Sequence, residues 1–332
     1  MSGAGEASPA VPFGDRLAAA VAARESQIVL GVDPDPAHLW PAPDGRLTAA
    51  ADVLAGALAQ AERAAAALAA AAARVPATAP AVAAGDPPGG AAAAVLAHCV
   101  ALIDAAGPAC VAVKPQLAHF ERFGFAGWLA LQAAIAHARE RGLLVIADAK
   151  RGDVASTAAA YADAILGGLG ADAVTLNPLL GRDALAPFAG RPGTGTFVLV
   201  RTSNAGAADL FDAELADGAP LWERIAGFVA EAGEPGPASG LAATGAVTGA
   251  TEPRHLARMR ELMPHAPFLL PGVGAQGGTV DALAAAFVPG RAAGLVSASR
   301  SIANAHGQHG GEPAGAARRE AERLRAQAWG LG

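Results

Sequence analysis

Cysteine, methionine, tyrosine and lysine are all scarce in this 332-residue sequence, which contains two, three, one and two of them respectively. Two cysteines in so long a chain indicate reduced residues and not a disulfide framework. A structural zinc site would need more cysteines or a close group of histidines. Acidic residues outnumber Lys and Arg by 30 to 24, and the net charge of −6 argues against a nucleic-acid-binding surface.

Long hydrophobic runs are also missing, so the sequence predicts no transmembrane helix and no membrane partner. Residues 60–74 are apolar by composition, but most are alanine, and Glu62, Arg63 and Arg74 interrupt them. The first 15 residues lack a basic start followed by an apolar stretch, so we expect no signal peptide. These observations favour a cytoplasmic protein.

The two lysines, Lys114 and Lys150, stand out because the remaining Lys-plus-Arg positions are all arginine. In a sequence so rich in Ala, Arg and Gly, a retained lysine suggests a role for its compact, titratable ammonium group, which arginine cannot replace. The alternative is chance survival on the surface.

Eight short apolar segments alternate with stretches of helical composition. Continuous apolar strands are typical of a parallel sheet covered on both faces, and eight β/α units over about 300 residues favour a closed barrel. A Rossmann-like sheet is the alternative, but no G-x-G-x-x-G motif follows the first strand. We therefore predict an α/β protein, a single-domain (β/α)8 TIM barrel over residues 1–332. Strands are expected within 28–33, 110–116, 143–150, 172–178, 196–203, 244–251, 268–274 and 293–300, and helices within 14–25, 47–73, 91–106, 125–140, 156–168, 220–232, 252–263 and 278–287.

Two segments are predicted to be flexible. Residues 1–10 resemble a disordered terminus. Residues 75–90 are rich in Ala, Pro and Gly without usable periodicity, which indicates a surface insertion between strands 1 and 2 and not a domain boundary.

Functional residues of such barrels lie at the C-terminal ends of the strands, and both lysines are expected there. The same positions carry a set of polar residues and one glycine: Asp33, Lys114, Asp148, Lys150, Asn177, Thr202, Ser203, Thr248, Gly272, Gln276, Ser299 and Arg300.

The densest group runs from Asp148 to Asp153. Asp148 and Lys150 are two residues apart in a predicted strand and therefore share a face, while Gly152 permits a sharp turn that directs Asp153 back or elsewhere. A lysine held between carboxylates stays protonated, so Lys150 is a fixed cation or a poised acid and a poor Schiff-base nucleophile. The alternative is a structural ion pair at a strand end.

A second feature lies at the end of the chain, where PGVGAQGG follows the seventh strand and SASRSI closes the eighth. The loops after strands 7 and 8 are the usual phosphate site in these barrels. Backbone N–H groups of the glycines would approach an anion, Gln276 would add an amide donor and Arg300 would clamp it bidentately. An ordinary glycine-rich turn beside a surface arginine is the alternative. The glycines concerned are Gly272, Gly274, Gly277 and Gly278.

The other strand ends allow two interpretations each. Asp33 could accept hydrogen bonds from ribose hydroxyls or only shape its turn, and Lys114 could pair with Asp33 or Asp148. Ser203 could contact a polar heterocycle or cap a loop. Thr157 could join the Asp153 turn or begin a helix.

At these residues the sequence resembles a known family. The segment ADAKRGDVASTAAAYA is similar to the signature of orotidine 5′-phosphate decarboxylases. FGDRL, GVDPDP, VKPQ, FERFG, VRTSN, PGVGAQGG and SRSI follow the order of the longer bacterial, type 2 branch of that family, between about residues 13 and 302. The chain departs from the pattern at Ala205, where proline is expected, and in the extra length at 75–90.

The resemblance implies a carboxy-lyase that converts orotidine 5′-monophosphate to UMP and CO2, the last step of de novo pyrimidine synthesis, without metal or organic cofactor. It also implies a homodimer with shared active sites. Lys150 would protonate C6, Asp148 would lie beside the substrate carboxylate, and Lys114 and Asp153 would complete a charge network. The implied binding residues are Asp33 for ribose, Ser203 for the pyrimidine, Gln276 and Arg300 for phosphate with the loop glycines Gly274 and Gly277, and Asp153 and Thr157 reaching into the neighbouring subunit's site.

Two other functions remain open. A metal-dependent sugar-phosphate aldolase or decarboxylase of the same suprafamily would share D-x-K-x-x-D and the phosphate loops, but it is expected to carry an acidic metal ligand where this chain has Lys114. A non-catalytic UMP-binding barrel would have no need of a proton donor such as Lys150.

Overall fold

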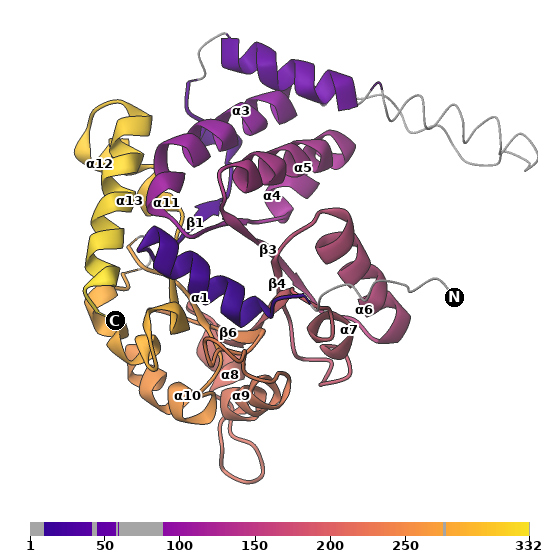
Figure 1. Ribbon diagram of the computed structural model, residues 1–332, viewed down its shortest axis with the longest axis vertical. Helices are drawn as coiled ribbons and strands as arrows, with labels where there is room; N and C mark the ends of the chain where they lie inside the picture. The colour runs from indigo at the N-terminus through magenta and orange to yellow at the C-terminus, as the bar shows by residue number, and fades with distance from the viewer. Residues whose placement is uncertain (1–9, 42–44, 58, 60–88, 275–276, 332) are drawn as a thin grey trace, which may run out of the picture.

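Eight parallel strands form a closed barrel in which each strand pairs with its neighbour in sequence and β8 pairs with β1 (Figure 1). The computed structural model describes residues 10–41, 45–57, 59, 89–274 and 277–331. The strands are β1 Ile28–Val32, β2 Ala112–Pro115, β3 Leu144–Arg151, β4 Ala173–Leu176, β5 Gly195–Arg201, β6 Thr244–Thr248, β7 Phe268–Pro271 and β8 Gly294–Ala298. All eight lie at the predicted segments, so the (β/α)8 barrel is confirmed.

Ring closure depends on the register between the first and last strands. Ile28 lies opposite Val296, and Leu30 lies opposite Ala298. Every residue of β1, β2, β4, β5, β6 and β8 is buried. The reason is that one face of each strand fills the barrel interior while the other packs beneath helices, which is why these segments are continuously apolar.

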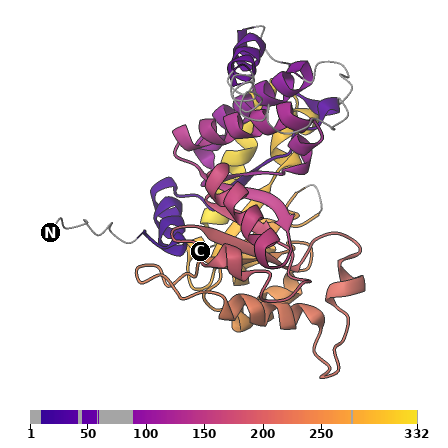
Figure 2. The ribbon, with the colours of Figure 1, turned by 90° about the vertical axis from the view of Figure 1, so that its right-hand side faces the viewer.

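Helices cover the outside of the barrel (Figures 1 and 2). The longer ones are α1 Phe13–Arg24, α3 Gly89–Ala106, α5 Gly124–Glu140, α6 Ala155–Ala162, α9 Leu221–Glu231, α10 Leu256–Leu262 and α13 Pro313–Trp329. Shorter α-helices are α4 Ala118–Glu121, α7 Ala186–Ala189, α8 Ala207–Phe211, α11 Arg300–Ala303 and α12 Ala305–His309. The 3-10 segments are η1 Pro36–His38, η2 Gly107–Ala109, η4 Pro253–His255, η5 Val280–Phe287 and η6 Arg291–Ala293, and η3 Asp163–Gly168 is a π-helical continuation of α6.

Helix α1 lies across the end of the barrel at which the strands begin (Figure 1). Its Phe13 packs edge-on against Phe197 with ring centroids 6.2 Å apart, and a side chain at Gly195, the first residue of β5, would collide with the Phe13 ring. The opposite end, where the strands finish, is left for a pocket.

Some predicted boundaries and types are wrong. Residues 278–287 contain a 3-10 helix and not an α-helix, because the buried residues Val280, Leu283 and Ala286 recur every third position, which is the 3-10 period. Helix α3 begins at Gly89, two residues before the predicted start at 91 and inside the segment 75–90. Helix α13 was not predicted. Residues 1–9 and 75–88 lie outside the described residues, as do 58 and 60–73 of the expected 47–73 helix, of which 47–57 and 59 are helical.

The expectation that no apolar segment is long enough to span a membrane is also wrong. Residues 90–109, which include most of α3, have a mean hydropathy of 1.7 over a sufficient length, and 67% of the segment is buried inside the protein. Helix α3 packs against α5 and α13, so alanine-rich neighbours on both sides account for its apolar composition. Cys99 on this helix and Cys110 after it are both free and buried.

The loop after β1 is fixed to α3 and α11 through Trp40. Its backbone N–H donates to Nδ1 of His98 on α3 at 3.1 Å, and its indole Nε1 donates to the carbonyl of Ala303 on α11 at 2.9 Å. Burial lowers the pKa of His98 to about 4. The neutral ring that results is the form that accepts the Trp40 hydrogen bond.

The pKa of His98 predicts a specific acid sensitivity. The pKa of an unfolded histidine is near 6.5, so below that pH the unfolded chain binds a proton at His98. The folded chain does not bind this proton until the pH falls to about 4. The stability contributed by neutral His98 is complete above pH 6.5 and is lost at about 1.4 kcal/mol per pH unit as the pH falls toward 4. We expect His98→Asn, which keeps an acceptor but does not titrate, to lose about 2 kcal/mol less than the wild type between pH 6.5 and 5. Urea unfolding at both pH values measures this, and equal losses in the two proteins would contradict it.

Candidate active site

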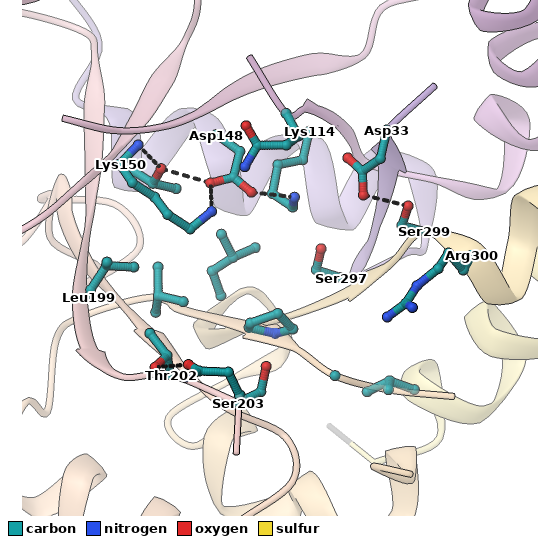
Figure 3. A pocket seen from close by; sticks show the side chains of 18 residues that line it. Asp33, Lys114, Asp148, Lys150, Leu199, Thr202, Ser203, Ser297, Ser299 and Arg300 are labelled. Carbon is teal, nitrogen blue, oxygen red and sulfur yellow. Dashed lines mark hydrogen bonds and ion pairs between the residues drawn. The ribbon is translucent and has the colours of Figure 1, made fainter. Parts of the chain in front are cut away.

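A pocket of about 320 Å³ opens at the end of the barrel where the strands finish (Figure 3). Its volume is within the range of small-ligand sites. Nine residues expected at these strand ends line it: Asp33, Lys114, Asp148, Lys150, Thr202, Ser203, Gly272, Ser299 and Arg300. Both lysines therefore face one cavity.

A lysine–aspartate–lysine array forms one wall of the pocket (Figure 3). Lys114 Nζ on β2 donates to Asp148 Oδ2 at 2.7 Å, and Lys150 Nζ donates to Asp148 Oδ1 at 2.5 Å. Lys114 and Asp148 are each only 7% exposed, whereas the Lys150 side chain is 44% exposed. The sequence predicted that Lys150 lies between two carboxylates, and within one chain this is wrong. Instead, the Asp148 carboxylate lies between the ammonium groups of Lys114 and Lys150.

Burial and the neighbouring charges act in opposite directions on this array. Burial alone raises the pKa of Asp148, but the adjacent Lys114 and Lys150 ammonium groups outweigh it and hold the pKa well below its usual range. Burial likewise lowers the pKa of Lys114, and the carboxylates of Asp148 and Asp33 more than compensate, so the pKa is raised. The pocket therefore presents an ionised carboxylate beside a charged lysine at neutral pH.

The backbone of Lys150 lies in the left-handed region, with φ of 46°. The β3–β4 register shifts here, since Ala147 lies opposite Val174 and Arg151 lies opposite Leu176. The bulge breaks the simple alternation from which Asp148 and Lys150 were predicted to share a face, although their side chains do meet. This conformation strains the backbone of a non-glycine residue, and such strain is often found at functional sites.

Because of this strain, the stability of the protein favours glycine at residue 150, whereas the proposed activity requires lysine there. We expect Lys150→Gly to be about 1 kcal/mol more stable than Lys150→Ala, because glycine adopts a positive φ without a clash between Cβ and the backbone. Urea unfolding of the two variants measures the difference, and both lack the ammonium group. A glycine variant less stable than the alanine variant would show that the backbone at residue 150 is not strained.

Asp33, which follows β1, is hydrogen-bonded to Ser299, which follows β8, where these two strands close the barrel. Ser299 Oγ donates to Asp33 Oδ2 at 2.6 Å. The other oxygen, Oδ1, is buried and has no hydrogen-bond partner among the described residues. A buried acceptor without a donor is costly unless a ligand satisfies it, so Asp33 is suited to accept a hydrogen bond from a hydroxyl in the pocket.

Arg300 lies across the pocket from Lys150 (Figure 3). Its side chain is exposed, and within the described ranges its guanidinium makes neither a hydrogen bond nor an ion pair. A free guanidinium at the pocket edge is available for an anionic group. The Lys114–Asp148–Lys150 array and the Arg300 guanidinium thus face one another across the cavity.

The glycine loop after β7 differs from the expectation. Gly272 lines the pocket, but Gly274 and Gly277 do not. The N–H groups of Gly274, Gly277 and Gly278 donate to carbonyls inside the loop at 2.9, 2.9 and 3.0 Å. Free amides for an anion would therefore require the loop to rearrange. Gln276 lies outside the described residues.

The other predicted residues that the structure describes do not line this pocket. Asp153 Oδ1 accepts from the Val154 N–H at 2.8 Å, and Thr157 is exposed on α6. Asn177 has a structural contact, since its Oδ1 accepts from the Leu179 N–H at 3.1 Å. Thr248 is fully buried and does not line the pocket.

Sequence reasoning missed several residues that the pocket contains. Leu199, Val247 and Leu269 form an apolar wall, and Gln116, Ser297 and Thr175 add polar groups. Thr175 is the most informative of these, because it contacts both Asp148 and Lys150. The sequence feature that could have identified Thr175 is its position as the single polar residue in the apolar segment AVTL of the fourth strand.

The closed barrel and the charged pocket at its C-terminal mouth define the class of the protein, a (β/α)8-barrel enzyme. In the described part of the chain no group of three or more His, Cys, Asp or Glu side chains is arranged to hold a metal ion.

Comparison with known proteins identifies the family. The model of the "Orotidine 5'-phosphate decarboxylase / HUMPS family" matches residues 47–317. The chain is 44% identical over 226 residues to the orotidine 5′-phosphate decarboxylase of Rhodopirellula baltica, covering 65% of this chain and 74% of that protein. It is also 44% identical over 232 residues to that of Roseiflexus castenholzii, covering 70% and 82%. The solved OMP decarboxylase of Leishmania donovani is similar, with a TM-score of 0.65 and 30% identity over 96% of this chain and 99% of that one. The chain belongs to the orotidine 5′-phosphate decarboxylase / HUMPS family.

Proposed function

We propose that this protein is a carboxy-lyase that converts orotidine 5′-monophosphate to UMP and CO2, the last step of pyrimidine biosynthesis. Family membership and the names of its relatives support this proposal. The observation that carries it is the Lys114–Asp148–Lys150 array facing Arg300 across one pocket, where Arg300 has no partner among the described residues. An ammonium array at one side and a phosphate-binding cation at the other suit a substrate with a reacting carboxylate at one end and a phosphate at the other.

In the proposed mechanism the bond between C6 and the carboxylate breaks, CO2 leaves and the electron pair stays on C6. The pyrimidine ring delocalises this pair poorly, so the protein stabilises it electrostatically. Lys150, the more exposed of the two lysines, provides the adjacent positive charge and then transfers a proton to C6. Asp148 lies beside the departing carboxylate, and Lys114 keeps Asp148 ionised and in place.

Substrate binding is assigned to residues around the remaining walls. The unpartnered Asp33 Oδ1 accepts from a ribose hydroxyl, and Ser203 contacts the pyrimidine. Arg300 holds the phosphate together with Gln276 and, after the loop rearranges, the amides of Gly274 and Gly277. Phosphate binding far from C6 supplies energy for loop closure and for the removal of water from the site.

We propose a homodimer in which Asp153 and Thr157 complete the partner's site. Neither residue lines the pocket of its own chain. The loops after β3 and β4 and helix α6 expose large apolar side chains, as expected of a surface that another chain covers. These side chains are Val154, Tyr161, Leu179 and Leu180.

The reaction is proposed to need neither metal nor organic cofactor, since Lys150 supplies both charge and proton. We also expect a cytoplasmic location, consistent with the free cysteines Cys99 and Cys110.

The activity is tested by incubating the purified protein with orotidine 5′-monophosphate while following the ultraviolet absorbance, with chromatographic identification of UMP. Stoichiometric UMP formation is expected. Binding of UMP without any turnover would instead favour a non-catalytic UMP-binding barrel.

The rival in the same family is a metal-dependent sugar-phosphate aldolase or decarboxylase. The Lys114 ammonium lies 2.7 Å from the Asp148 carboxylate and would repel a divalent cation bound there. Turnover of orotidine 5′-monophosphate is therefore expected to survive prolonged treatment with EDTA. Loss of activity that added Mg²⁺ restores would support the rival.

The shared site is tested by mixing two inactive variants. A site that takes Lys150 from one subunit and Asp153 from the other is intact once in each mixed dimer of Lys150→Ala with Asp153→Ala. Random exchange should restore up to about a quarter of the wild-type activity. Continued inactivity of a mixture shown to contain mixed dimers would place Asp153 outside the partner's site.

A further inference from the structure

We propose that Thr175 on β4 is a positioning residue that holds Lys150 and Asp148 in their reactive arrangement. The inference rests on the proposed function for the chemistry it serves, but its evidence is a separate pair of hydrogen bonds. Thr175 Oγ1 accepts from the backbone N–H of Lys150 at 2.9 Å and donates to Asp148 Oδ1 at 3.0 Å. The hydroxyl thus links the backbone of one charged residue to the side chain of the other.

The bulge in β3 explains why a side chain is needed here. Three residues lie between Ala147 and Arg151 on β3, while only one, Thr175, lies between their partners Val174 and Leu176 on β4. Thr175 lies opposite this excess chain. The Lys150 amide donates to the Thr175 hydroxyl where a regular ladder would use a carbonyl, and the ladder resumes where the Asn177 N–H donates to the Arg151 carbonyl at 2.8 Å.

The direction of both bonds is fixed. The Lys150 backbone N–H can only donate and the ionised Asp148 carboxylate can only accept, so the hydroxyl accepts from Lys150 and points its one proton to Asp148. The carboxylate consequently receives three side-chain donors: Lys114 on Oδ2, and Lys150 and Thr175 on Oδ1.

Burial makes this link hard to replace. Thr175 is 1% exposed, so without its hydroxyl water has little access to the Lys150 amide or to this side of Asp148. The left-handed backbone at Lys150 would lose the acceptor that holds its amide, and its ammonium would no longer be fixed against Asp148. Small errors in the position of a reacting group reduce the rate strongly, while the distant phosphate site is untouched.

The experiment compares variants with and without the hydroxyl. Thr175→Val keeps the branched shape and removes both hydrogen bonds, whereas Thr175→Ser keeps the hydroxyl. We expect kcat for orotidine 5′-monophosphate to fall by about 10- to 100-fold in the valine variant while KM changes little, and the serine variant to stay within a few-fold of the wild type. Thr175→Ala separates hydroxyl from volume: it should match valine, not serine.

Thr196→Val is the matched control. Thr196 is a buried threonine on the adjacent strand β5, and its hydroxyl donates to Thr244 Oγ1 at 3.3 Å, away from the pocket. Its removal is expected to leave kcat unchanged. Circular dichroism melting and UMP affinity verify that each variant is folded and binds.

The outcomes separate this inference from the proposed function. An inactive wild type overturns the proposed function. An active wild type with kcat unchanged in both Thr175→Val and Thr175→Ala overturns only the role of Thr175. An equal loss of kcat in Thr175→Ser and Thr175→Val would also overturn it, since the hydroxyl would then be irrelevant.

Discussion

Replacing Lys150 with alanine is expected to lower kcat by about 10⁴-fold or more, since proton donation and electrostatic stabilisation are both lost with one group. Lys150 Nζ is 2.5 Å from Asp148 and faces the cavity, and among the described residues the only arginine that lines the pocket is Arg300, on the opposite side. The more deeply buried Lys114 remains bound to Asp148 and cannot replace it, because it lies on the other oxygen of that carboxylate. Single-turnover assays at high enzyme concentration measure the residual rate.

A second variant separates charge from proton donation. Lys150→Arg keeps a cation but offers no proton near neutral pH, so it should retain UMP binding and still lose most of the turnover. UMP affinity is expected to be similar in the wild type and both variants, because the phosphate contact proposed for Arg300 does not involve residue 150. Turnover near the wild-type value in Lys150→Ala would reject Lys150 as the proton donor.

Replacing Arg300 with alanine is expected to reduce kcat/KM by roughly 10²-fold or more, mainly through KM, because charge-assisted bonds to a phosphate are lost. Within the described part of the chain the Arg300 guanidinium has no competing protein partner. The substitution should therefore weaken only the binding of the ligand. Stability should hardly change for the same reason. Steady-state kinetics and UMP titration provide the measurement.

Arg291→Ala is the matched control for Arg300. Arg291 precedes β8 as Arg300 follows it, so the two arginines lie at opposite ends of the same strand. Arg291 stacks on Trp329 at 4.4 Å and donates to the Trp329 carbonyl at 3.3 Å. Its loss should leave KM unchanged. Equal KM values in Arg300→Ala and the wild type would remove Arg300 from the phosphate site.

The barrel was predictable because its signal is repetitive. Each strand is apolar on both faces and ends in polar residues, and the same pattern occurs eight times. The gathering of Lys114, Asp148, Lys150 and Arg300 followed from that topology, since all parallel strands finish at one end.

Details that depend on exact backbone geometry were not predictable. The left-handed conformation of Lys150 and the contact with Thr175 arise from a bulge, which shifts register without a sequence signature such as glycine at residue 150. The glycine loop was expected to offer its amides to an anion, but composition does not tell whether those amides already bond inside the loop, as Gly274 and Gly278 do.

The pairing of β1 with β8 has a consequence for synthesis of the protein on the ribosome. By residue 175 the emerging chain contains both lysines and Asp148, yet Ser299 and Arg300 follow more than a hundred residues later. Contacts so distant in sequence form late, because the intervening chain must be ordered first. We therefore expect each nascent chain to carry Lys114, Asp148 and Lys150 in an unclosed sheet until translation is nearly finished. A product that ends before β8 would lack Arg300 and leave the edges of β1 and β7 unpaired.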